Sequence, residues 1–308
     1  MSNARLQCGR IQTQNTGMRM VIDCNALSQT QLVDFLDGSR GNIAVLTDFC
    51  VMESFNRGAG VHLSYQTLSR HPGQVLVLQT TPYIARLHPR SKGLLNRLTD
   101  HKGTADFPKY CRALASGGSM AGTNFEFKRD LARNFIAELT PAAEALRAPM
   151  IAMMQRHSET DLNVLRTQKR LTSDILNRAT EDIARLTAGL YRDIPNFGGL
   201  PSHPEVLYSF PFRMSVCHYA LALHWAWKGG LHSWPAEKLR NDLTDCTYAA
   251  HASFFDGLIT GDGRLGDVYN LGVKLLEGVF GLHALTARKI EADQIGAAGR
   301  TRGVAKRE

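Results

Sequence analysis

The chain has 308 residues, of which 44% are hydrophobic and 21% are charged, and its net charge is +8. This length suits one large domain or two modest ones, and the composition excludes a disordered or fibrous chain. The positive charge favours a polyanionic partner such as nucleic acid, although charge alone identifies no partner.

The cysteine usage and the apolar windows indicate a reduced, cytoplasmic protein. Six cysteines are scattered along the chain without a CxxC pair, which argues against a disulfide scaffold or a zinc ribbon. Residues 1–17 lack the apolar core of a secretory signal. The most apolar window, residues 216–227, is too short to cross a bilayer, so no membrane association is expected.

Short apolar runs between polar turns predict the strands. They cover residues 18–22, 74–79 and 258–260, and residues 42–46 form either a strand or the start of a helix. Asp23 directly follows the first run and Asp262 lies just beyond the last. Because open α/β sheets place their sites at the carboxyl ends of strands, these two aspartates are candidate site residues.

Periodic apolar residues predict the helices, and helical signals dominate between the third and the last strand. The predicted helices cover residues 27–36, 49–56, 130–146, 149–157, 161–191 and 212–227. The amphipathic helix over 161–191 either covers the core or pairs with a second copy of the chain, so a homodimer through the helical region is one expectation.

Glycine and serine residues predict flexible parts of the chain. The sequence SGGSMAGT, within residues 103–127, predicts a flexible link. Residues 1–17 and 291–308 are expected to be flexible tails, and the basic C-terminal tail would add nonspecific attraction to phosphate groups.

The stretch from residue 241 to residue 270 gathers acids within a helix, a short strand and a second helix. Asp242 and Asp245 lie one turn apart on one helix face. Asp256 is interpreted as the end of that helix and Asp267 as the cap of the next, which leaves Asp262 free at the strand end. Gathered carboxylates predict Mg²⁺ or Mn²⁺, because these cations prefer oxygen ligands.

Four motifs in chain order resemble those of the PIN-domain nucleases. Asp23-Cys24-Asn25 follows the first strand, and Glu53 lies on an early helix. Asp245-Cys-Thr-Tyr-Ala-Ala opens a helix with small residues, and Leu258-Ile-Thr-Gly-Asp262 ends a late strand. The resemblance covers roughly residues 18–85 and 232–290, and it departs from compact members of the family in the long spacing between Glu53 and Asp242.

The resemblance implies a Rossmann-like three-layer α/β/α sandwich with a central parallel sheet, formed by residues 18–85 and 232–290. Residues 86–231 would then be a mostly α-helical insertion. It also implies Mg²⁺- or Mn²⁺-dependent hydrolysis of phosphodiester bonds, usually in RNA. A phosphodiester repels hydroxide, and cations at the carboxylates would offset that repulsion.

The resemblance also assigns roles to individual residues. The positions of the metal-binding acids are occupied by Asp23, Glu53, Asp245 and Asp262, with Asp242 as an auxiliary acid, and Asn25 and Thr260 take the places of polar residues that orient the acids. Next to these acids in the sequence, Arg57 and Arg264 are either phosphate contacts or ordinary surface arginines.

Several other functions are consistent with parts of the sequence. A PIN-like fold can serve as a nucleic-acid-binding or protein-interaction module without catalysis, and a structure-specific DNA nuclease would need the same acids. A haloacid-dehalogenase-type phosphatase is disfavoured because that chemistry needs two aspartates two residues apart, whereas Phe254 stands two residues before Asp256 and Asn25 two residues after Asp23.

A zinc site and an aromatic stacking platform are weaker alternatives. The spacing of the candidate zinc ligands matches no common zinc site, and those residues are Cys217, His218, His224, His232 and Cys246. The tryptophans either stack on bases or belong to the core, and they are Trp225, Trp227 and Trp234.

Overall fold

The computed structural model describes residues 17–56, 61–115, 119–168, 170–195, 199–228 and 235–282. The predicted C-terminal tail over 291–308 and nearly all of the predicted N-terminal tail lie outside these residues.

Four parallel strands form a central sheet in the order β3-β2-β1-β4. They are β1 (Arg19–Ile22), β2 (Ile43–Leu46), β3 (Val75–Val77) and β4 (Gly257–Ile259). Met20 of β1 pairs with Ala44 of β2 on one side and with Gly257 of β4 on the other. The predicted central parallel sheet is confirmed, and residues 42–46 contribute a strand rather than the start of a helix.

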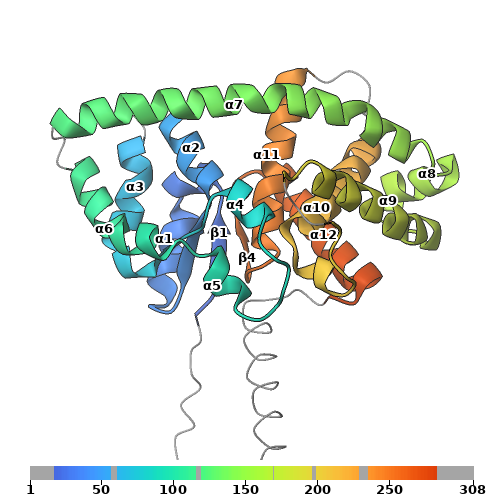
Figure 1. The fold of residues 1–308 in the computed structure, drawn as a ribbon, viewed down its shortest axis with the longest axis horizontal. Helices are drawn as coiled ribbons and strands as arrows, with labels where there is room; N and C mark the ends of the chain where they lie inside the picture. The colour runs from blue at the N-terminus through green and yellow to red at the C-terminus, as the bar shows by residue number, and fades with distance from the viewer. Residues whose placement is uncertain are drawn as a thin grey trace, which may run out of the picture.

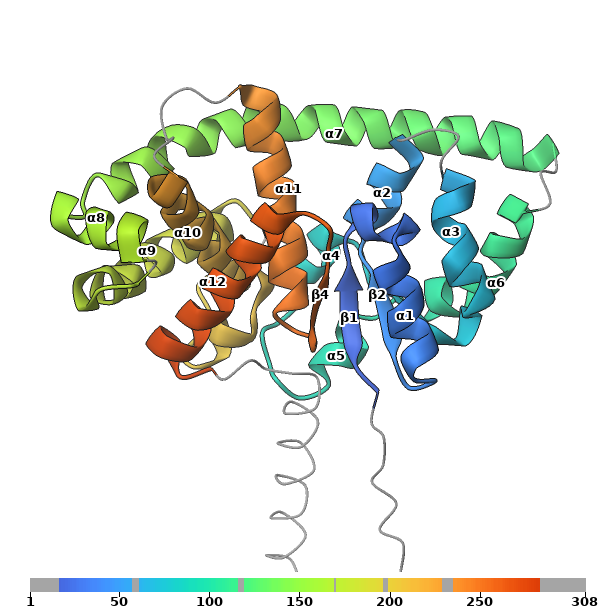
Figure 2. The same ribbon diagram turned by 180° about the vertical axis from the view of Figure 1, so that it is seen from behind.

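The strands are short and almost uninterruptedly apolar, as expected for parallel strands that are covered on both faces. Val21, Ile22 and Val45 have no exposed surface. Helix α1 lies in front of the sheet in Figure 2, whereas α4 and α5 lie in front of it in Figure 1. The chain therefore has an α/β fold with helices on both sides of its sheet.

Helices account for most of the described chain. The α-helices are α1 (Thr30–Gly38), α2 (Asp48–Asn56), α3 (Val61–Arg70), α4 (Thr81–Ala85), α5 (Leu94–Leu98), α6 (His101–Ala115), α7 (Ser119–Met154), α8 (Glu159–Gln168), α9 (Ser173–Arg192), α10 (Phe210–Lys228), α11 (Ala236–Ala252) and α12 (Gly263–Phe280). Three 3₁₀ turns join them: η1 (Cys24–Ser28), η3 (Pro72–Gln74) and η4 (Glu205–Tyr208).

Two helix predictions are wrong in the region after β3. The expected flexible link over 103–127 is occupied by α6 and the start of α7, on either side of residues 116–118. A glycine in a helix costs only about 1 kcal/mol, and α6 packs against α3 and β3, so packing outweighs that cost. Helix α7 also continues through Pro149, where a break was predicted, because it is packed along α2, α10 and α11.

The predicted helix over 161–191 is two helices, α8 and α9. The second begins after Thr172, whose Oγ1 accepts a hydrogen bond of 3.2 Å from the backbone N–H of Ile175. A threonine cap of this kind satisfies an otherwise unpaired N–H and so favours a new helix start. The apolar periodicity crosses this break, which is why the sequence alone suggested a single helix.

The helical region packs onto the sheet layer instead of standing apart from it. Helix α7 runs along one end of the molecule, past α2 and α11 (Figure 1). Helix α10, buried almost throughout as predicted, packs against α9, α11 and α12. Among the described helices, none is both long and apolar enough to cross a membrane.

Gly257 opens β4 in a conformation that side chains rarely adopt, with φ of 153°. A Cβ atom at this position would lie 2.8 Å from Cε of Met20 on the neighbouring strand. Glycine therefore lets β4 enter the sheet immediately after the chain turns at Asp256.

Arg213 of α10 is a buried cation with 0% exposure. Its Nε donates to the carbonyl of Leu207 at 3.1 Å, and its guanidinium lies 5.2 Å from the ring centroid of Phe254. Nη1 and Nη2 have no hydrogen-bond partner among the described residues, and burial lowers the pKa of this side chain to about 10.

Arg213→Met is expected to raise the free energy of unfolding by about 1–3 kcal/mol, because an apolar side chain of similar length avoids burying a poorly paired charge. The midpoint of urea unfolding should rise at an unchanged slope. A lower midpoint would show that the guanidinium stabilises the fold.

Candidate functional site

The first and last strands place two acidic motifs side by side at the carboxyl edge of the sheet. Asp23, 2% exposed, follows β1, and its backbone N–H donates to the carbonyl of Ile259 at 3.0 Å. The hydroxyl of Thr260 donates to Oδ2 of Asp23 at 2.8 Å and accepts from the N–H of Asp262 at 2.9 Å. Thr260 thus links two aspartates that are more than two hundred residues apart in the sequence.

Asp262 is the N-cap of α12. Its Oδ1 accepts hydrogen bonds from the backbone N–H groups of Arg264 at 2.7 Å and Leu265 at 3.2 Å. The expectation that Asp267 caps this helix is therefore wrong, because Asp267 lies inside α12. Asp256 holds the start of β4 against β1, since its Oδ2 accepts from the N–H of Arg19 at 2.7 Å.

Arg264, in the first turn of α12, points its guanidinium among three carboxylates. Nη1 lies 2.5 Å from Oδ1 of Asp242, and Nη2 lies 2.9 Å from Oδ2 of Asp245. Nη2 also lies 3.6 Å from Oδ2 of Asp262. With 26% of its side chain exposed, Arg264 is a partly buried cation that is paired with carboxylates.

Asp242 is completely buried and is held from two sides. Its second oxygen, Oδ2, accepts a hydrogen bond of 2.8 Å from Nε1 of Trp225 on α10. Burial raises the pKa of Asp242, and the charge of Arg264 opposes this rise. Trp225 therefore belongs to the core and orients an acid, and it is not exposed for stacking on bases.

Asp245 is a mostly buried acid of the cluster, with 15% of its side chain exposed. Burial raises the pKa of this carboxyl to about 8, and the charges of Asp262, Asp242 and Asp23 add to the rise while Arg264 opposes it. Without a further cation, Asp245 therefore retains its proton at neutral pH.

This shift predicts how the stability of the metal-free protein depends on pH. The unfolded chain releases the Asp245 proton near pH 4, whereas the folded chain keeps it until about pH 8, so the folded state binds more protons between these values. Asp245 contributes stability below pH 4, and that contribution is lost as the pH rises to 8. We expect the thermal midpoint in EDTA to fall between pH 4 and pH 8, and to fall less for Asp245→Asn than for wild type.

Glu53 of α2 is joined to α11 through a tyrosine. The hydroxyl of Tyr248 donates to Oε2 of Glu53 at 2.7 Å. Burial raises the pKa of Tyr248, and the charges of Glu53 and Asp23 contribute to this rise, which places the phenol near both acids. Asn25 lies exposed on η1, and Arg57 lies outside the described residues.

A second polar group at the same edge was not predicted as part of a site. Asp48, after β2, accepts hydrogen bonds of 2.7 Å from both the N–H and the hydroxyl of Thr81, after β3. The same hydroxyl lies 3.1 Å from Nε2 of His251, whose pKa is lowered to about 3 by burial, so this imidazole is neutral. The sequence signal that could have revealed this group is that polar residues also follow β2 and β3, as they follow β1 and β4.

The ligand types at the acidic cluster suit a hard divalent cation, because every donor is a carboxylate oxygen. In the described part of the chain, however, no group of three or more acidic, histidine or cysteine side chains is arranged to hold a metal ion. Arg264 lies among the carboxylates, and Oδ1 of Asp262 caps α12, so both contacts would compete with a metal ion for these oxygens. A metal ion at this site would require Arg264 to move.

Comparisons of this chain with protein-family models, with curated proteins and with solved structures give no match.

Proposed function

We propose that this chain is a PIN-like nuclease that hydrolyses phosphodiester bonds, preferentially in RNA, with Mg²⁺ or Mn²⁺ at the acidic cluster. The observation that carries this proposal is the charge of the cluster. The guanidinium of Arg264 meets three carboxylates, and a fourth, that of Asp23, is linked to Asp262 through Thr260. If all four were ionised they would exceed the single cation by three charges, and burial together with these charges raises the pKa of Asp245 to about 8. The four acids are Asp23, Asp242, Asp245 and Asp262.

Each residue has a distinct part in this proposal. Thr260 orients Asp23, and the cap of α12 orients Asp262. Trp225 holds Asp242 from the apolar side, so hydrogen bonds orient these three acids, and Arg264 would have to move to admit a cation. A divalent cation supplies neutralisation of the phosphate charge and a lower pKa for bound water.

The proposal is tested by incubating labelled single-stranded RNA, single-stranded DNA and branched DNA with the protein in Mn²⁺, in Mg²⁺ and in EDTA. We expect metal-dependent cleavage, fastest for RNA, that Asp23→Asn and Asp262→Asn abolish. Asp267→Asn is the matched control, because Asp267 lies on the same helix outside the cluster. Equal cleavage by wild type and both cluster variants would exclude the proposal, and cleavage of branched DNA alone would identify a structure-specific DNA nuclease.

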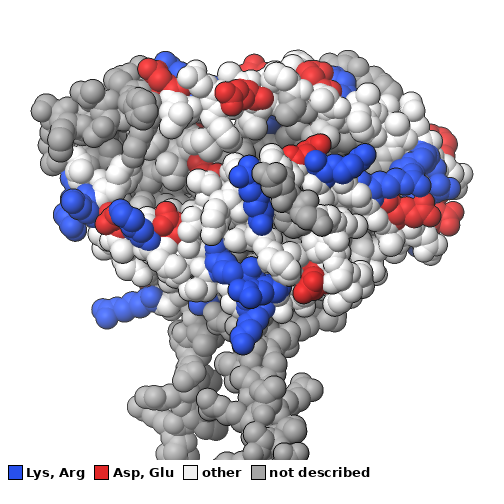
Figure 3. Space-filling model, in the orientation of Figure 1, with Lys and Arg blue, Asp and Glu red and all other residues white. Residues whose placement is uncertain are grey.

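Binding without catalysis is the second candidate, and Arg264 favours it because the guanidinium already neutralises part of the cluster. Lysine and arginine side chains also gather over α5 (Figure 3). The segment next to α5 carries exposed Arg86, Arg90 and Lys92.

A pure binding module would retard RNA in a gel with an affinity that falls as salt rises, would show no cleavage, and would lose affinity in Arg86→Gln/Arg90→Gln. Retention of affinity in that double variant would exclude this basic segment as the binding surface.

A further inference from the structure

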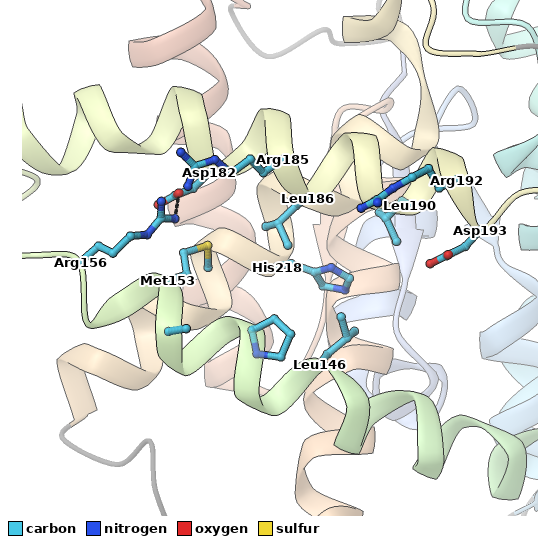
Figure 4. A pocket seen from close by; sticks show the side chains of 13 residues that line it. Leu146, Met153, Arg156, Asp182, Arg185, Leu186, Leu190, Arg192, Asp193 and His218 are labelled. Atoms are coloured by element: carbon cyan, nitrogen blue, oxygen red, sulfur yellow. Dashed lines mark ion pairs between the residues drawn. The ribbon is translucent and has the colours of Figure 1, made fainter.

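A cavity of about 510 Å³ lies between α7, α9 and α10, and it shares no lining residue with the acidic cluster. The C-terminal part of α7 forms one wall and α9 forms the facing wall (Figure 4). A volume of this size is typical of sites for small molecules.

His218 of α10 supplies a polar group that the protein leaves unsatisfied. The ring lies between Leu186 and Leu146 at the cavity (Figure 4), and the residue is only 3% exposed. Its Nε2 has no hydrogen-bond partner among the described residues. Burial lowers the pKa of His218 to about 4, so the ring is neutral at pH 7. A buried nitrogen in this state favours a ligand oxygen as its partner.

The walls of the cavity are largely apolar. Leu146 and Met153 come from α7, and Leu186 and Leu190 come from α9. The three leucines are only partly buried, so part of their apolar surface remains open to a ligand. Covering that surface with an apolar group is favourable, because it removes apolar area from water.

The charges at the cavity favour an anion. Asp182 is buried and forms an ion pair with Arg156, so these two charges offset each other. Arg185 is held only by an exposed contact of 3.4 Å with Glu181, which contributes little.

Arg192 adds a second available cation at the C-terminal end of α9. Its Nη2 lies 3.9 Å from the position that a Cβ atom on Gly189 would occupy. The guanidinium is therefore folded back over Gly189, which lines the cavity. Among the described residues that line the cavity, Asp193 is the only other acid, so Arg185 and Arg192 outnumber it and an anionic group is favoured.

We propose that this cavity binds a small amphipathic carboxylate. The apolar body lies between Leu146 and Leu186, the carboxylate meets Arg192, and a hydroxyl or carbonyl oxygen of the ligand hydrogen-bonds to Nε2 of His218. This site is independent of the proposed nuclease activity, because it shares no residue with the acidic cluster.

The test is isothermal titration of the full chain with octanoate, 3-hydroxyoctanoate and octylammonium. We expect saturable one-to-one binding of both carboxylates, tighter for the hydroxy acid, and no saturable binding of octylammonium. Leu186→Trp should abolish binding by filling the cavity, and Arg192→Gln should weaken it at least 10-fold. Arg178→Gln, on the same helix but outside the cavity, is the matched control and should bind as wild type does.

His218→Leu should remove the advantage of the hydroxy acid while octanoate still binds, and circular dichroism should show that each variant is folded. Absence of saturable binding by both carboxylates would overturn the proposal. Unchanged binding in folded Leu186→Trp, or equal binding of octylammonium, would overturn it as well.

Discussion

Asp245→Asn is expected to reduce metal-dependent phosphodiester cleavage by more than about 100-fold, since even residues that only support metal ligands cost about 10–100-fold when replaced. The same change should raise the thermal midpoint of the metal-free protein at pH 7, because wild type must take up a proton at Asp245 on folding at this pH and the asparagine variant need not. Asparagine has the shape of the protonated carboxyl, and the pKa of about 8 means that the native side chain is largely protonated under these conditions.

The measurements are initial cleavage rates at saturating Mn²⁺ and thermal unfolding in EDTA. Asp267→Asn, whose side chain lies 3.8 Å from His224, should retain the wild-type rate. A fall of many degrees in the EDTA midpoint of Asp245→Asn would instead identify Asp245 as a structural partner of Arg264. Titration with Mn²⁺ separates the two roles, because a ligand variant binds the cation more weakly without a lower thermal midpoint in EDTA.

Arg264→Gln should destabilise the metal-free protein by about 3–5 kcal/mol, because removing one partner of a buried ion pair leaves an uncompensated charge. The affected carboxylate is that of Asp242, which is completely buried and lies 2.5 Å from the guanidinium. If the cluster is a cation site, Mn²⁺ should restore much of this loss, since the cation then replaces the charge of Arg264.

Urea unfolding of both proteins, with Mn²⁺ and with EDTA, measures this effect. We expect a larger Mn²⁺-dependent gain in stability for Arg264→Gln than for wild type. Arg133→Gln is the control, because its exposed ion pair with Asp130 at 3.8 Å contributes little. A variant that is destabilised equally with and without Mn²⁺ would show that the cluster recognises a guanidinium and not a divalent cation.

The local pattern of the sequence was enough to find the strands and the acids that follow two of them. Residues 18–22 and 258–260 were recognisable because short apolar runs between polar turns suit buried parallel strands. The proximity of Asp23 and Asp262 then followed from topology, because parallel strands place their carboxyl ends on one edge. The helix boundaries near residues 116–118 and 169–172 could not be found in this way, since caps and packing decide them.

The sequence by itself predicted which acids can meet, from strand ends, helix faces and the family resemblance: Asp23, Glu53, Asp245 and Asp262, with Asp242 as an auxiliary acid. Only the tertiary structure decided what those acids contact. Packing of α10, α11 and α12 brings Trp225 and Arg264 to Asp242 from separate helices, and packing of α2 against α11 brings Tyr248 to Glu53. The reason is physical: strand ends are set by local periodicity, whereas the partner of a buried charge depends on helices that meet only when the core forms.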